Sequence, residues 1–240
     1  MKTILTLCCS LLLVCPGFAK DKRPNVVTLL ADDLGYRDIG CYDGPVKTPV
    51  LDKLAAEGVR FTDFHSGAAT CSPSRATFLT GRQHCRTGVY SVITERLHKM
   101  HLLESETTIA DLLKENGYAT AHFGKWDHRY DEVSQHQQDY DFSDGYTGNR
   151  TGGSKGTGGP AASPDPKRID TITDQALHFI DCQHATDTPF YLQLSHYAVH
   201  LDIFYNQSTL ERFQKVTPGR KHNMPEFAAM TGDMDASIGR

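Results

Sequence analysis

Several features are scarce in this sequence, and each shortage excludes a class of protein. Basic residues are not in excess, because 25 Lys and Arg stand against 29 Asp and Glu, and the net charge of −4 gives no reason to expect nucleic acid as a partner. We find no internal repeat and no Walker-type phosphate loop. The apolar run at residues 4–14 is soon interrupted by Pro16 and is too short to favour a membrane span.

The N-terminus has the pattern of a secretory signal. Lys2 supplies a positive charge, the apolar run follows it, and small residues precede a cleavage point after Ala19. We therefore expect a signal peptide at residues 1–19, a single domain over residues 20–240, and a secreted or periplasmic protein.

Cysteine is also scarce. Cleavage of the signal would leave four of the seven cysteines: Cys41, Cys71, Cys85 and Cys182. If Cys71 is a nucleophile, an odd set of three remains, which excludes a disulfide scaffold. A bridge between two of the three is compatible with the sequence, which does not choose the pair.

The stretch that begins at Cys71 predicts a short capped helix. Ser72 suits the N-cap, Pro73 the first helical position and Gly81 the C-terminal stop. Cys71 would then lie just before a helix N-terminus, where the dipole favours a thiolate. Arg75 lies one turn further on and can face the same point. The alternative is an ordinary capped helix with a buried cysteine.

Two carboxylates follow a predicted strand. The apolar, β-branched run at residues 26–31 predicts a fully buried strand of a parallel sheet, and Asp32 and Asp33 come directly after it. Open α/β sheets place their sites at this end of the strands, and adjacent carboxylates stay ionised most easily around Ca²⁺ or Mg²⁺. A lone Asp-Asp pair can also be a polar turn.

Helix and strand patterns alternate along the rest of the chain. We expect helices over residues 48–58, 107–116, 167–182 and 225–240, and strands over residues 59–64, 118–123 and 189–195. Thr107 or Thr108 would cap the second of these helices. A Gly-rich surface loop would occupy residues 140–166. The alternation predicts an α/β fold with helices on both faces of the sheet.

Two further groups lie at predicted strand ends. Lys125 follows the strand at residues 118–123 and could bind an oxyanion, although a solvated lysine is the alternative. His196 and His200 follow the strand at residues 189–195, and a strand end does not put two histidines on one helical face.

The stretch from Cys71 resembles the signature of the sulfatase family, Cys-x-Pro-x-Arg followed by Leu-Thr-Gly-Arg, with every position filled. The Asp-Asp-Leu-Gly sequence after the first strand resembles the metal motif of that family. The resemblance implies an arylsulfatase-like member of the alkaline-phosphatase-like superfamily, an α/β/α sandwich around a mostly parallel sheet. It also implies that a maturation enzyme converts Cys71 to formylglycine. Asp32, Asp33 and residue 71 would hold a metal, Ca²⁺ rather than Mg²⁺.

The resemblance implies roles for further residues. Arg75, Lys125 and His200 would offset the charge of the sulfate oxygens. The family sequence Gly-Lys-Trp-His is not fully matched, because Asp127 stands where the histidine is expected. His128, one residue later, is therefore a candidate for hydrogen bonding or proton transfer.

The implied reaction is hydrolysis of a sulfate ester on a small molecule or a glycan. The hydrated formylglycine, acidified by the metal, would attack sulfur and expel the alcohol. Only the first part of the family pattern is present, so we expect a truncated chain with weak metal binding. A phosphoester or phosphonate hydrolase of the same superfamily and a non-catalytic secreted remnant are the alternatives.

Overall fold

The computed structural model describes most of the chain after the predicted signal segment. The described residues are 23–93, 100–128, 133–156, 158–217 and 223–240. The signal peptide expected at residues 1–19 lies outside them and stays a prediction. None of the helices among the described residues has the length and apolar character that a membrane crossing requires.

A parallel sheet forms the centre of the fold. Its strands lie in the order β1 (Val26–Leu30), β5 (Phe190–Ser195), β2 (Ala119–Gly124) and β3 (Phe142–Ser143). Ser195 is in register with the last residue of both β1 and β2. The segments that follow these three strands therefore start from one edge of the sheet.

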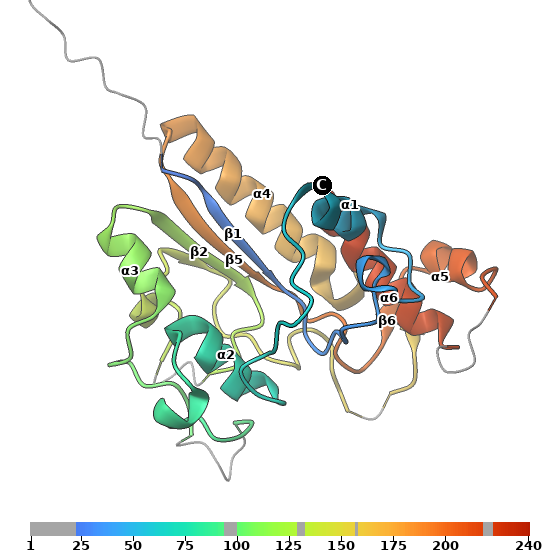
Figure 1. The fold of residues 1–240 in the computed structure, drawn as a ribbon, viewed down its shortest axis with the longest axis horizontal. Helices are drawn as coiled ribbons and strands as arrows, with labels where there is room; N and C mark the ends of the chain where they lie inside the picture. The colour runs from blue at the N-terminus through green and yellow to red at the C-terminus, as the bar shows by residue number, and fades with distance from the viewer. Residues whose placement is uncertain (1–22, 94–99, 129–132, 157, 218–222) are drawn as a thin grey trace, which may run out of the picture.

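Helices cover both faces of this sheet. Helix α4 (Ile169–Thr186) lies along one face, and α2 (Cys71–Thr80) and α3 (Ile109–Glu115) lie on the other (Figure 1). The alternation of side chains along β5 fits this arrangement, because Tyr191 belongs to the core shared with α2 and α3, whereas Leu192 packs with α4. The predicted α/β/α sandwich around a parallel sheet is confirmed.

Helices α1 (Pro49–Glu57), α5 (Gln207–Phe213) and α6 (Pro225–Ile238) extend this sandwich beyond the carboxyl edge of the sheet, together with the parallel pair β4 (Ala161–Ala162) and β6 (Phe204–Tyr205). Four short 3-10 turns lie in the connections between elements: η1 (Gly40–Tyr42), η2 (His84–Arg86), η4 (His136–Gln138) and η5 (Pro166–Arg168). Met230 and Met234 of α6 form a separate core with the segment after β5. That packing holds the strand-end segment in place.

Two sequence predictions about strands are wrong. Residues 59–64 form no strand, and the side chains of Val59 and Phe64 are 82% and 75% exposed. Strand β1 is not fully buried either, because it is the edge strand of the described sheet and Val27 and Leu29 are exposed. A strand forms only where a neighbour pairs with its backbone, and the described chain places none beside residues 59–64.

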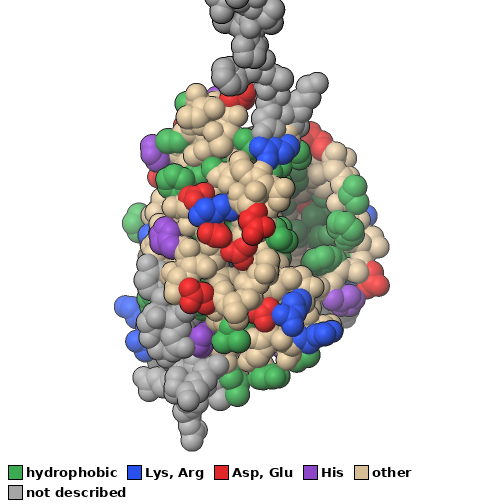
Figure 2. Space-filling view, turned by 90° about the vertical axis from the view of Figure 1, so that its left-hand side faces the viewer, with side chains coloured by type: hydrophobic (Ala, Val, Ile, Leu, Met, Phe, Trp, Pro, Cys, Tyr) green, Lys and Arg blue, Asp and Glu red, His purple; other side chains and the backbone are tan. Residues whose placement is uncertain are grey.

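Several apolar side chains are exposed at the surface. Figure 2 shows hydrophobic side chains gathered in a hollow of one face, next to a region where acidic and basic side chains alternate. Charges of both signs are interspersed, as the near-neutral composition predicts.

Candidate active site

Three charged side chains meet in the interior at the carboxyl edge of the sheet. Lys125 Nζ lies 2.7 Å from Asp32 Oδ2, and Arg75 Nη2 lies 3.3 Å from Asp32 Oδ1. Arg75 Nη1 also donates to the Lys125 carbonyl at 2.7 Å. All three are buried, Lys125 completely. The structure therefore unites residues that lie 93 positions apart in the chain.

Gly124 positions Lys125. Its φ of 98° lies in the left-handed region, and a Cβ at this position would approach the Ser195 carbonyl oxygen to 2.1 Å. The next backbone N–H, that of Lys125, donates to the same carbonyl at 2.7 Å. A glycine is thus required for β2 to end against β5 and turn the lysine into the interior.

The start of α2 differs from the prediction by two residues. Thr70 is the N-cap and Cys71 the first helical residue, so Ser72 is not the cap. The Ser72 hydroxyl donates instead to Asp127 Oδ2 at 2.8 Å, which a purely local capping rule could not anticipate. Gly81 ends the helix as predicted, with a φ of 65° and its N–H on the Thr77 carbonyl.

Cys71 is partly buried, and the expected thiolate is wrong. Burial raises the pKa of the Cys71 thiol, and the carboxylate of Asp127 raises it further. Lys125 acts in the opposite direction but does not outweigh them. An unconverted Cys71 is therefore protonated at neutral pH and is a weak nucleophile.

Asp127 is a site residue that the motif comparison noted only as a departure. Its carboxylate accepts hydrogen bonds from the side chains of Ser72 and Cys71, and its Oδ1 lies 3.8 Å from Lys125 Nζ. Burial by itself would raise the pKa of Asp127, but Lys125, Arg75 and the two hydrogen bonds outweigh it and lower the pKa. Asp127 is therefore ionised at neutral pH.

His200 and Asp33 form a second, more exposed part of the site. His200 Nε2 lies 3.8 Å from Asp33 Oδ2, and its Nδ1 lies 2.5 Å from the Leu201 carbonyl. Ser154 Oγ lies 3.4 Å from the same nitrogen. The Asp33 side chain is 60% exposed, in contrast to the buried triad, and its backbone φ is 62°.

Lys167 lies beside the site, and no motif or periodicity in the sequence marks it. This residue lies in the turn before α4 with a φ of 56°, and its buried Nζ donates to Ser154 Oγ at 3.1 Å. Burial lowers the pKa of Lys167 to about 8, and the carboxylates of Asp202 and Asp32 counteract this effect. Because Asp32 and Lys125 both affect its pKa, Lys167 is a third cationic side chain near the site, after Arg75 and Lys125.

His128 is buried beside Trp126 rather than exposed at the site. The two ring centroids lie 5.4 Å apart in an edge-on arrangement. Burial lowers the pKa of His128 to about 4, so the ring is neutral at physiological pH. Neither ring nitrogen has a hydrogen-bond partner among the described residues. Its role in hydrogen bonding or proton transfer stays a prediction.

The predicted metal ligands are not arranged as a metal site in this chain. Both Asp32 oxygens are engaged by Lys125 and Arg75, and within the described ranges no three His, Cys, Asp or Glu side chains are close enough together to hold an ion. Asp32, Asp33 and residue 71 thus do not fit a Ca²⁺ site as they stand.

The other predicted cysteines are unpaired. Cys41, Cys85 and Cys182 are free thiols in the described structure, as is Cys71. Cys85 and Cys182 are exposed. Among the described cysteines, no disulfide bridge therefore supports the site.

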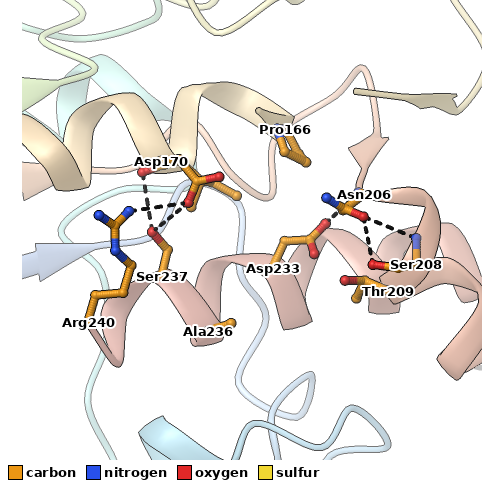
Figure 3. A pocket seen from close by; sticks show the side chains of 10 residues that line it. Pro166, Asp170, Asn206, Ser208, Thr209, Asp233, Ala236, Ser237 and Arg240 are labelled. Atoms are coloured by element: carbon orange, nitrogen blue, oxygen red, sulfur yellow. Dashed lines mark hydrogen bonds and ion pairs between the residues drawn. The ribbon is translucent and has the colours of Figure 1, made fainter. Parts of the chain in front are cut away.

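A separate cavity of about 220 Å³ lies between α4, α5 and α6 (Figure 3). Burial raises the pKa of Asp233 there, and its carboxylate accepts the Asn206 N–H at 2.7 Å. None of the predicted site residues lines this cavity; its lining is Pro166, Ile169, Asp170, Asn206, Ser208, Thr209, Asp233, Ala236, Ser237 and Arg240.

Comparison with known proteins decides the family. The family model named Sulfatase matches residues 24–240. The chain belongs to the sulfatase family. Among the relatives of this sulfatase chain, human (Homo sapiens) arylsulfatase A is 46% identical over 117 residues, which cover 48% of this chain and 23% of that protein. The match thus spans about a quarter of the relative's length.

Solved structures share the fold. The putative sulfatase yidJ from Bacteroides fragilis is 21% identical, with a TM-score of 0.72 over 92% of this chain and 58% of that chain. BT4656, solved with its substrate D-glucosamine-2-N,6-O-disulfate, is 24% identical, with a TM-score of 0.65 over 83% of this chain and 40% of that chain. These matches confirm the architecture of a sulfatase.

Proposed function

We propose that this chain carries the nucleophile and oxyanion-binding side of a sulfuric ester hydrolase site. The observation that carries the proposal is the meeting of Cys71, Arg75 and Lys125 at one sheet edge in a chain of the sulfatase family. A buried lysine and arginine beside a helix N-terminus suit the three outer oxygens of a sulfate ester.

Conversion of Cys71 to formylglycine is part of this proposal. The protonated thiol is a weak nucleophile, and the hydrated aldehyde would supply an oxygen nucleophile in its place. Asp127 would orient residue 71, since its carboxylate already accepts a hydrogen bond there. A formylglycine-generating maturation enzyme would be the partner that recognises the stretch from Cys71.

Arg75 and Lys125 would bind and orient the ester in this proposal. Asp32 holds both cations in place through its two oxygens, which reduces the reorganisation needed when an anion arrives. His200 lies at the exposed side, within reach of solvent, where a leaving alcohol would depart. This neighbourhood suits it to donate a hydrogen bond to that oxygen.

Divalent metal dependence is general in the family, and Ca²⁺ is the ion that we propose for this site. Because the ligands present here fall short of the ~6–8 oxygens that Ca²⁺ takes, we expect weak binding by this chain. Calorimetric titration of the 240-residue chain with CaCl₂ should show a Kd on the order of 1 mM or weaker. A Kd in the micromolar range would contradict the geometry described for Asp32 and Asp33.

A sulfated glycan or a sulfated small molecule is the proposed substrate class. BT4656 acts on a sulfated glucosamine, and human arylsulfatase A is a curated relative. We propose export by the signal expected at residues 1–19, which would place the protein outside the cytoplasm.

Paired assays test the proposed function. The chain would be co-expressed with a formylglycine-generating enzyme and assayed on 4-nitrophenyl sulfate and 4-nitrophenyl phosphate, with Cys71→Ala as the control. Sulfate turnover that Cys71→Ala abolishes is the expected result. A clear preference for phosphate would favour the phosphoester or phosphonate hydrolase, and no turnover of either ester would favour the non-catalytic remnant.

A further inference from the structure

Opposite charges balance in the interior of the site. Arg75 and Lys125 contribute two positive charges, and Asp32 and Asp127 contribute two negative ones. Three consecutive ion pairs connect these side chains: Arg75 with Asp32, Asp32 with Lys125, and Lys125 with Asp127. None of the four side chains is more than 14% exposed. The buried cluster therefore carries no net charge.

One further buried pair lies beside this cluster, together with a more exposed carboxylate and histidine. Lys167 lies next to Asp202, and both are buried, so that they add one charge of each sign. At the more exposed side, Asp33 faces His200 at 3.8 Å. The Lys167–Asp202 pair therefore leaves the charge balance of the cluster unchanged.

Asp127 is the member of the cluster that lies against the reacting residue. Its carboxylate accepts hydrogen bonds from Cys71 and from Ser72, whereas Asp32 is held between the two cations. An ester whose sulfur or phosphorus faces residue 71 would have its outer oxygens close to this carboxylate. Asp127 would repel that group in proportion to its charge.

We propose that Asp127 is a specificity-determining residue, which makes this site select a monoanionic sulfate ester over a dianionic phosphate ester. The inference rests on the proposed sulfate-ester site and adds the reason for its selectivity. A sulfate monoester carries one negative charge, whereas a phosphate monoester carries nearly two above its second pKa of about 6. A cluster without net charge can bind the monoanionic sulfate ester, but it does not compensate the additional negative charge of the phosphate ester.

The backbone at Asp127 allows a clean test. Its φ of 64° is left-handed, a region that Asn and His also enter readily. Asp127→Asn keeps the shape and an acceptor oxygen and removes only the charge. Asp127→His is a second variant with a different side chain at the same φ. Glu115→Gln is the matched control, because it also removes one negative charge. Glu115 is exposed at the end of α3, just before β2 begins, whereas the site lies where β2 ends.

The experiment is calorimetric binding of phenyl sulfate and phenyl phosphate at pH 8 and constant ionic strength, with Cys71 left unconverted. We expect wild-type protein to bind the sulfate ester more tightly, and both Asp127 variants to reduce this preference on the order of tenfold. Glu115→Gln should retain the wild-type preference.

Three results would overturn the proposal. An unchanged preference in folded Asp127→Asn or Asp127→His, or an equal change in Glu115→Gln, would remove Asp127 as the determinant while leaving the sulfate-ester site intact. Failure of wild-type protein to bind either ester would instead overturn the anion site itself, and with it this inference.

Discussion

At the scale of single residues, Lys125 is the central charge of the site. It is fully buried and lies between Asp32 and Asp127, at 2.7 Å and 3.8 Å from their carboxylate oxygens. Without Lys125, each carboxylate would lose its main compensating charge. The loss would be costly, because an unpaired carboxylate would then remain buried. The same residue thus serves both the fold and the proposed chemistry.

Replacement of this lysine should destabilise the protein strongly. Lys125→Met keeps the apolar stem, removes the charge, and should lower the free energy of unfolding by about 3–5 kcal/mol. Lys53→Ala is the control, since Lys53 pairs with Glu57 at the surface and should cost less than about 1 kcal/mol. Urea denaturation measures both. Equal losses in the two variants would show that Lys125 is not a buried partner.

Buried histidines should make the fold sensitive to acid. Burial lowers the pKa of His122 to about 3 and those of His128 and His196 to about 4. The unfolded chain, with a histidine pKa of about 6.5, therefore binds more protons between pH 6.5 and 4. The stabilisation is fully present above pH 6.5 and is lost as the pH falls towards 4.

His196→Leu tests this dependence. Between pH 7.5 and 5.5 the variant should lose about 1 kcal/mol less unfolding free energy than wild-type protein, because one titrating group is gone. Denaturation at the two pH values gives the difference. Identical losses would mean that His196 is as accessible to protons in the folded state as in the unfolded state.

At the scale of elements, local rules predicted helices better than strands. The caps of α3 and α2 are local in sequence, so Gly81 could be found without the fold and the cap of α3 could be narrowed to Thr107 or Thr108. Strand pairing is not local, and residues 59–64 have strand composition without a partner beside them in the described structure. The N-cap of α2 was missed because Ser72 is used by Asp127 instead.

The cap of α3 can be tested directly. The sequence left Thr107 and Thr108 open, and the structure shows a capping box between Thr108 and Asp111. Thr108→Ala should therefore cost about 1 kcal/mol of unfolding free energy, whereas the exposed Thr107→Ala should cost only a few tenths. Thermal or urea unfolding distinguishes them, and the reverse order would assign the cap to Thr107.

At the scale of the whole molecule, topology explains why the motif residues could be predicted. Asp32, Lys125 and His200 all follow strands of one parallel sheet, so strand assignment alone brings them to one edge. Lys167 enters from an irregular turn before α4, and no periodicity or motif marks such a position. Asp33 is exposed and His128 is buried beside Trp126, and motif spacing in the sequence does not determine such differences in burial.

Residue 71 is the proposed reactive position of a sulfatase-type site. Mass spectrometry of the peptide that contains Cys71, after co-expression with a formylglycine-generating enzyme, tests it most directly. Cys85, an exposed free cysteine outside the signature, is the internal control. We predict conversion of Cys71 to the aldehyde and an unmodified Cys85. An unmodified thiol at residue 71 under these conditions would contradict it.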